Sequence, residues 1–143
     1  GSSSYVSAGL RKNNTIEFED FLQKNYHDSI RTISDSILIV QAIFKQDGQL
    51  YDTQLLYGSN YVLYNFFFQN YNNFNKLHFP YGRKPTYDSL FQPVLISGKP
   101  FNGLIDVYIK LKSDNSFDIS ATGYRRSILI KNYIDDLKNP LIY

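Results

Sequence analysis

The sequence predicts an α+β fold, with a small antiparallel sheet of three to four strands and helices packed on one face. Two observations carry this prediction. Residues 36–58 have the alternation and the turn residues of a β-hairpin, and residues 103–121 have the alternation of two further strands around a polar turn. Segments with helical spacing of apolar residues precede, separate and follow these strands, and such helices gather on one face of an antiparallel sheet.

The chain reads as a single domain over residues 14–143, because a length of 143 residues fits one domain. Residues 1–13 are mostly small and polar, and we expect a flexible tail or a cloning remnant there. An aromatic share of 17% indicates a folded core, since disordered chains contain few aromatic residues. The lack of cysteine excludes disulfides and thiolate metal sites.

The first helix is expected to begin at Asn14. Glu17 follows three residues later, which is the spacing of a capping box. Phe18, Phe21 and Leu22 then form one apolar stripe at helical spacing. We therefore expect this helix to face the core through those three side chains.

The clearest element is a hairpin around Asp47 and Gly48. Both residues tolerate the positive φ of a type I′ turn, so a two-residue turn fixes the register of the flanking strands. The pairs expected to face the core are Val40–Leu55, Ala42–Thr53 and Phe44–Tyr51. The pairs expected on the mixed, half-exposed face are Gln41–Gln54, Ile43–Asp52 and Lys45–Leu50.

A second helix is expected to begin after Ser59, with Leu63, Phe67 and Phe74 on its inner face. Residues 78–89 contain two prolines and a glycine and read as a loop. In the strand that begins at residue 103, alternation points Ile105, Val107 and Ile109 inward, into one core with Val40, Phe44 and Leu55. A turn at residues 113–116 leads to a strand over residues 117–121. A last helix is expected after Ser127, with an inner stripe of Ile130, Tyr133, Ile134 and Leu137.

The sequence offers no set of residues suited to catalysis. His27 and His78 lie in separate segments, and without cysteine they leave little for a metal site. Asp135 and Asp136 are helix neighbours whose side chains diverge, which does not suit an acid–base pair. A nucleophile elbow and a phosphate-binding glycine pattern are both missing. We therefore expect a protein that is not an enzyme and that uses neither a cofactor nor a metal.

The charge pattern bears on the partners. The net charge is only +2 and the basic residues are scattered, whereas nucleic-acid binding needs a clustered basic surface. We therefore expect no nucleic acid as a partner. The chain also contains no apolar run of the ~20 residues that a membrane-spanning helix needs.

The segment FQPVLISGKPFNGLIDVYIKL carries a family resemblance. Its pattern F-x-P-x-x-x-x-G-K-P-x-x-G is formed by Phe91, Pro93, Gly98, Lys99, Pro100 and Gly103. Together with the hairpin and the helix before it, this segment resembles the C-terminal domain of TonB-like proteins, over residues 17–112. Three features depart from that family: an aromatic-rich second helix, extra residues around 78–89, and an added strand and helix over residues 113–139.

The resemblance implies a non-catalytic periplasmic module. It would bind another envelope protein by adding a strand of the partner to an exposed sheet edge. The expected edge is the strand of residues 117–121 or that of residues 103–111. The expected contact residues are Asp106, Tyr108, Lys110, Lys112, Asp118 and Ser120, and the expected structural turns contain Asp47, Gly48, Gly98, Lys99 and Pro100. The sequence leaves a homodimer open, and any membrane contact is expected only through regions outside this sequence.

An alternative comes from the aromatic residues of the second helix. In a ligand-binding domain similar to the NTF2-like or cystatin-like families, a curved sheet and helices enclose a pocket, and these tyrosines and phenylalanines would line it. A core packed with side chains and an exposed edge strand favours the interaction module, whereas an enclosed cavity favours the ligand-binding domain.

Overall fold

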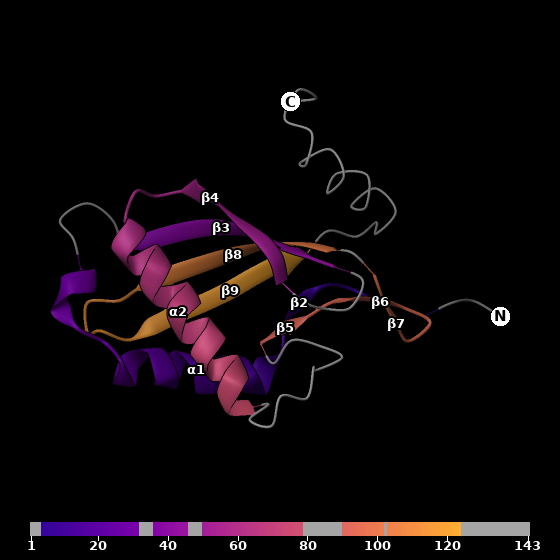
Figure 1. Ribbon diagram of the computed structural model, residues 1–143, viewed down its shortest axis with the longest axis horizontal. Coiled ribbons are helices and arrows are strands. Elements are labelled where there is room, and N and C mark those ends of the chain that lie inside the picture. Colours follow the sequence, from indigo (N-terminus) through magenta and orange to yellow (C-terminus); the bar gives the residue numbers. More distant parts are fainter. Residues whose placement is uncertain (1–3, 32–35, 46–49, 79–89, 102, 124–143) are drawn as a thin grey trace.

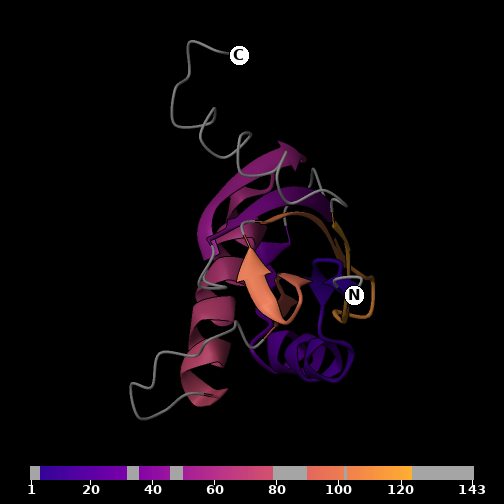
Figure 2. The ribbon, with the colours of Figure 1, turned by 90° about the vertical axis from the view of Figure 1, so that its right-hand side faces the viewer.

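The computed structural model describes residues 4–31, 36–45, 50–78, 90–101 and 103–123. Its main sheet is antiparallel, with the strand order β4-β3-β8-β9 (Figure 1). The sheet curves around two helices that lie on the same side of it (Figure 2). The predicted α+β fold, an antiparallel sheet of three to four strands with helices on one face, is confirmed. These elements are α1 (Lys12–Lys24), β3 (Ile37–Phe44), β4 (Leu50–Tyr57), α2 (Tyr61–His78), β8 (Gly103–Leu111) and β9 (Phe117–Gly123).

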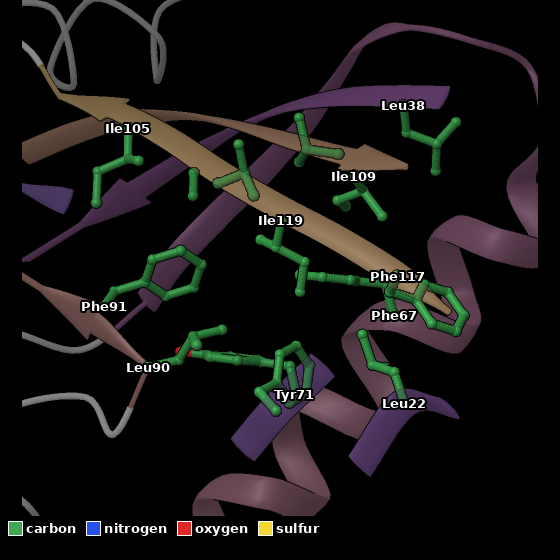
Figure 3. Close-up of a cluster of buried hydrophobic side chains, with 14 of the residues drawn as sticks. Leu22, Leu38, Phe67, Tyr71, Leu90, Phe91, Ile105, Ile109, Phe117 and Ile119 are labelled. Carbon is green, nitrogen blue, oxygen red and sulfur yellow. The ribbon is translucent and has the colours of Figure 1, made fainter. Parts of the chain in front are cut away.

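The hydrophobic core lies between the inner face of this sheet and the two helices (Figure 3). It contains the five predicted inner residues Val40, Phe44, Ile105, Val107 and Ile109, all at most 1% exposed, while the sixth, Leu55, packs against them. Helix α1 contributes Phe18 and Leu22, and helix α2 contributes Leu63, Phe66, Phe67, Tyr71 and Phe74. Alternation along the strands and helical spacing along the helices therefore place the core correctly.

The aromatic side chains of α2 connect it to three other elements. The Phe67 ring centroid lies 5.3 Å from that of Phe18 on α1. The Phe66 ring stacks on Phe117 of β9 at 5.8 Å. The Tyr71 ring lies 5.5 Å from Phe91. Such ring pairs add to the stability that area burial gives, and they fix α2 against the sheet.

The predicted register of the hairpin is confirmed in the middle of the two strands and is wrong at the end near the turn. Val40 pairs with Leu55, Gln41 with Gln54, Ala42 with Thr53 and Ile43 with Asp52. Phe44, however, pairs with Leu50 and not with Tyr51, because the register shifts between Ile43 and Phe44. The predicted turn at Asp47 and Gly48 lies outside the described residues.

The side chains on the outer face of β3 are more buried than the sequence predicts. We expected Gln41 and Ile43 to be half exposed, but they are 5% and 3% exposed. Their cross-strand neighbours on β8, Asp106 and Leu104, belong to the same outer face, and Leu104 is also buried. The opposite end of β3 on this face is exposed at Ile37 (40%), and so is Tyr108 (45%) on the neighbouring strand β8.

Short strands at the N-terminus form two further sheets that sequence analysis missed. β1 (Tyr5–Val6) pairs with β6 (Val94–Ile96), which also pairs with β7 (Lys99–Phe101), and β2 (Gly9–Leu10) pairs with β5 (Phe91–Gln92). The described part of the expected tail therefore pairs as strands up to Leu10 and begins helix α1 at Lys12, with Ala8 buried in the core. Its partners lie far away in the sequence, so local composition gives no sign of them.

The start of α1 is also corrected. The helix begins at Lys12, after Arg11, and no side chain caps it. The hydroxyl and the main-chain N–H of Thr15 both donate to the Arg11 carbonyl at 2.8 Å, so Asn14 and Glu17 do not form the predicted capping box. Arg11 is held by its main-chain N–H, which donates to the Leu90 carbonyl at 2.9 Å. This contact sets where the chain turns into the helix.

Two of the predicted turns are found. The β6–β7 hairpin turns at Ser97 and Gly98, with φ values of 52° and 80°, so Lys99 and Pro100 belong to β7 and not to the turn. Residues 113–116 reverse the chain between β8 and β9, with a hydrogen bond from the Lys112 N–H to the Ser116 carbonyl. The last helix predicted after Ser127 lies outside the described residues, as does most of the loop over residues 78–89.

Candidate functional site

Strand β8 is not an edge of the sheet. It lies between β3 and β9 and pairs with both along its length. The prediction that residues 103–111 form a partner-binding edge is therefore wrong, because the main-chain groups of a central strand are already paired.

The predicted contact residues come together, but on the face of the sheet. Tyr108 pairs with Ser120 and Lys110 with Asp118 across β8 and β9. The Lys112 ammonium lies 3.3 Å from the Asp118 carboxylate, and both side chains are exposed. An exposed pair of this kind contributes little to stability. These residues, with Asp106, form a polar strip on the outer face rather than a strand-pairing site.

Strand β9 is an edge, but α1 covers it. The main-chain N–H of Ile119 points away from β8 and donates to the Glu19 carboxylate of α1 at 2.9 Å. Burial raises the pKa of the Glu19 carboxyl above its ordinary value, and the nearby Asp118 carboxylate raises it further, while the Ile119 hydrogen bond acts in the opposite direction. A half-buried carboxylate thus takes the hydrogen bond that an added strand would need.

The far end of β9 is covered by the N-terminal segment. A Cβ atom added to Gly123 would lie 2.3 Å from the Ala8 carbonyl oxygen. No strand could pass between these two backbones. Both predicted edges are therefore closed to a partner, β8 by its neighbours and β9 by α1 and by Ala8.

The opposite edge, β4, has no neighbour on its outer side among the described elements. The ladder shows which of its groups point outward. The Leu111 N–H donates to the Ser36 carbonyl at 2.8 Å, and hydrogen-bonded pairs alternate along an antiparallel ladder. Gln41 and Ile43 must then bond to β4, through Gln54 and Asp52.

It follows that Thr53 and Leu55 direct their main-chain groups away from β3. An independent contact agrees: the Thr53 N–H donates to the carboxylate of Asp52 at 2.8 Å. Asp52 thus protects one outward donor of the edge, as charged side chains commonly do on exposed strands. The N–H of Leu55 has no such carboxylate beside it on the strand. The pairing of β3 with β4 is regular only from Asp52 to Leu55, because the register shifts at both ends of this stretch.

Four large apolar side chains are exposed at the end of this edge and at the start of α2, and we call them the aromatic corner: Leu56, Tyr57, Tyr61 and Val62. Their exposed fractions are 48%, 57%, 63% and 45%. Ile37, 40% exposed, lies beside it, because the Gly58 backbone packs against the Ile37 carbonyl. Sequence analysis missed this surface, although one signal was present: no charged residue occurs between Asp52 and Lys76.

The connection inside the aromatic corner is firmly held. Asn60 is 2% exposed and caps α2, since its side-chain oxygen accepts from the Leu63 N–H at 2.9 Å. Its amide also donates to the Ile30 carbonyl at 3.0 Å. Gly58 has a φ of 96°, and a Cβ there would lie 2.8 Å from the Ile37 carbonyl oxygen. The exposed tyrosines on either side are thus presented by a fixed turn.

Chemistry-bearing residues do not converge in the described parts of the chain. No group of three or more histidine, cysteine, aspartate or glutamate side chains could hold a metal there. His78 lies 3.3 Å from the Glu17 carboxylate at the surface, and His27 contacts the Ser29 hydroxyl. No helix in those parts is long and apolar enough to cross a membrane.

Comparisons of the chain with protein-family models, with curated proteins and with solved structures find no match.

Proposed function

We propose that this domain is a non-catalytic protein-interaction module that binds an extended segment of another protein as an added strand along β4. The observation that carries the proposal is the outward direction of the Thr53 and Leu55 main-chain groups on the edge that no described element covers. The covering of β9 by Glu19 supports it, since it leaves one edge of the main sheet for pairing. Added strands of this kind gain affinity from main-chain hydrogen bonds.

The location and the kind of partner belong to the same proposal. The segment with Phe91, Pro93, Gly98 and Lys99 resembles the TonB-like C-terminal domain, which supports a periplasmic module and a partner in the cell envelope. The edge used here differs from the two that this resemblance first suggested.

Main-chain pairing alone would give weak binding. The regular stretch of β4 offers a few outward groups, and each net hydrogen bond contributes about 0.5–1.5 kcal/mol. A micromolar complex needs about 8 kcal/mol. Side-chain contacts must therefore supply most of the affinity, and they must lie next to Leu55.

The test removes one outward donor and keeps the fold. Peptides that bind the wild-type domain are first selected from a displayed library of random twelve-residue sequences. Leu55→Pro deletes the outward N–H, which a proline on a strand edge can do without breaking the ladder to β3. Leu55→Ala is the matched control, because it removes the same side chain and retains the N–H.

We expect Leu55→Ala to bind the selected peptides and Leu55→Pro to lose them, with circular dichroism confirming that both variants fold. In the wild type, bound peptide should slow hydrogen exchange at the Leu55 amide. Equal peptide binding by the two variants, or an unchanged exchange rate at Leu55, would overturn strand addition at β4.

A further inference from the structure

The aromatic corner continues directly from the proposed pairing edge. Leu56 follows Leu55 in the chain as the extra residue at the register shift between Ile39 and Val40, and Tyr57 then pairs with Ile39. Side chains of an added strand alternate between the two faces of the sheet. Tyr57 pairs with Ile39, so its side chain lies on the outer face with that of Ile37, and a partner side chain on this face beyond Leu55 would lie next to Tyr57.

The chemistry of this surface favours uncharged partners. Between Asp52 and Lys76 the chain has no charged side chain, and Lys110, the cross-strand neighbour of Ile37, lies on β8 and not on the pairing edge. Burying an unpaired charge is unfavourable. Tyrosine is among the residues most enriched at binding hot spots, while lysine, glutamate and aspartate are depleted from interface centres. The turn held by Gly58 and Asn60 fixes the corner before binding, which lowers the entropy lost on association.

We propose that the aromatic corner selects the partner: it accepts an uncharged extended segment that carries a large apolar side chain on the outer face, beside Tyr57. This inference rests on the proposed strand addition at β4 and adds the class of sequence that β4 recognises. A membrane surface fits less well, because interfacial elements usually carry basic residues on the polar face, and the corner has none nearby in sequence.

The test uses labelled nine-residue peptides of the form Thr-Thr-Ser-X-Thr-Y-Ser-Thr-Thr, in which X and Y occupy the same face of a strand. X and Y are both leucine, both tyrosine, both serine, both lysine or both glutamate. Affinity is measured by fluorescence anisotropy for wild type, for Leu55→Pro, and for the double variant Tyr57→Ser/Tyr61→Ser. Leu77→Ser is the control, since Leu77 is 65% exposed at the other end of α2.

We expect the leucine and tyrosine peptides to bind at least tenfold more tightly than the lysine and glutamate peptides. This preference should disappear in the double tyrosine variant and persist in Leu77→Ser, while Leu55→Pro should lose all peptides. If Leu55→Pro abolishes binding but wild type binds all five peptides with equal affinity, the selectivity is overturned while strand addition at β4 still stands.

Other outcomes also decide the question. Apolar peptides that bind Leu55→Pro as well as wild type would overturn strand addition while showing that the corner binds side chains. If no peptide binds the wild-type domain, the selectivity is overturned. It is also overturned if wild type co-sediments with phosphatidylcholine vesicles and only the double tyrosine variant fails to do so. A further outcome is that sedimentation velocity shows the free domain to dimerise and the double tyrosine variant not to. That result would assign the corner to a second copy of the chain instead.

Discussion

The carboxylate of Glu19 on α1 accepts a hydrogen bond from the main-chain N–H of Ile119 on β9, over 2.9 Å and across 100 residues of sequence. A helix carboxylate thereby occupies the edge of a sheet. On the opposite edge, Asp52 takes the outward N–H of its own neighbour, Thr53. The two edges are protected to different extents. Helix α1 lies along β9, whereas on β4 the Asp52 carboxylate accepts from one outward N–H only. This difference is why we assign partner binding to β4.

The first prediction concerns the pH dependence that Glu19 adds to stability. Its pKa is raised in the folded protein, chiefly by burial, so the folded state binds the proton more tightly than the unfolded state. The stabilisation is then fully present below the ordinary glutamate pKa and is lost as the pH rises through the raised pKa. Glu19→Gln removes this dependence and keeps an oxygen for the Ile119 N–H.

Thermal melts of wild type and Glu19→Gln between pH 3 and pH 8 (the range follows from the usual glutamate pKa of about 4.3) should show the variant gaining relative to wild type as the pH rises. Asp114 provides a control of opposite sign, because hydrogen bonds from Ser116 lower its pKa. Asp114→Asn should lose stability relative to wild type as the pH rises. A melting-temperature difference between Glu19→Gln and wild type that is constant across this range would contradict the assigned cause.

The second prediction concerns Gly58, which joins β4 to α2. Its φ of 96° is unfavourable for other residues, and a Cβ would collide with the Leu38 side chain at 2.6 Å and the Ile37 carbonyl at 2.8 Å. Gly58→Ala should lower the free energy of unfolding by more than about 2 kcal/mol, through positive φ and steric overlap together.

Gly98 separates these two effects, because its φ is 80° and nothing lies within 4 Å of an added Cβ. Gly98→Ala should cost only about 1 kcal/mol, the penalty for positive φ alone. Urea denaturation of both variants measures the difference. Equal losses would mean that the close approach of Gly58 to Ile37 has no energetic weight.

The third prediction tests the placement of the core. Val107 is fully buried between β3 and β9, whereas its neighbour Tyr108 is 45% exposed on the outer face. Val107→Asp should unfold the domain, because it buries a charge without a partner. Tyr108→Asp should fold with a change within about 1 kcal/mol, as is usual for surface substitutions. Near-ultraviolet circular dichroism distinguishes the two outcomes, and a folded Val107→Asp protein would refute the inward assignment.

Local pattern was sufficient to predict most of the fold. Alternation and helical spacing placed Val107 and Phe67 in the core, because burial follows the period of each element. The pairing of Leu10 with Phe91 was missed, since these residues are distant in sequence and each strand has only two residues. The shift that moves Phe44 from Tyr51 to Leu50 was missed for another reason: an extra residue in one strand leaves the alternation of the other unchanged.

The binding edge could not be predicted from the sequence, because an edge is a property of strand order. The alternation of residues 103–111 and 117–121 is the same whether each strand is central or outermost. Only the position of β8 between β3 and β9 decides that its main chain is unavailable. The aromatic corner was partly visible in the sequence as a stretch without charge from Thr53 to Asn75, but its exposure required the packing of α2.

The last prediction tests the direction of the main-chain groups on β4, from which the proposed function follows. Asp52 and Gln54 should direct their N–H groups to β3, and Leu55 should direct its N–H outward, as the Leu111–Ser36 hydrogen bond implies. In the free protein, the amide of Gln54 should therefore exchange with deuterium at least tenfold more slowly than the amide of Leu55. The Gln54 amide can exchange only when the ladder to β3 opens, whereas the Leu55 amide already faces outward. Substitution should follow the same order: Gln54→Pro removes a ladder bond and should cost about 3 kcal/mol or more, whereas Leu55→Pro should cost no more than Leu55→Ala plus about 1 kcal/mol. If Leu55 proves to be the protected amide, the alternation is reversed, and Gln54 and Leu56 would then become the residues that a partner strand could reach.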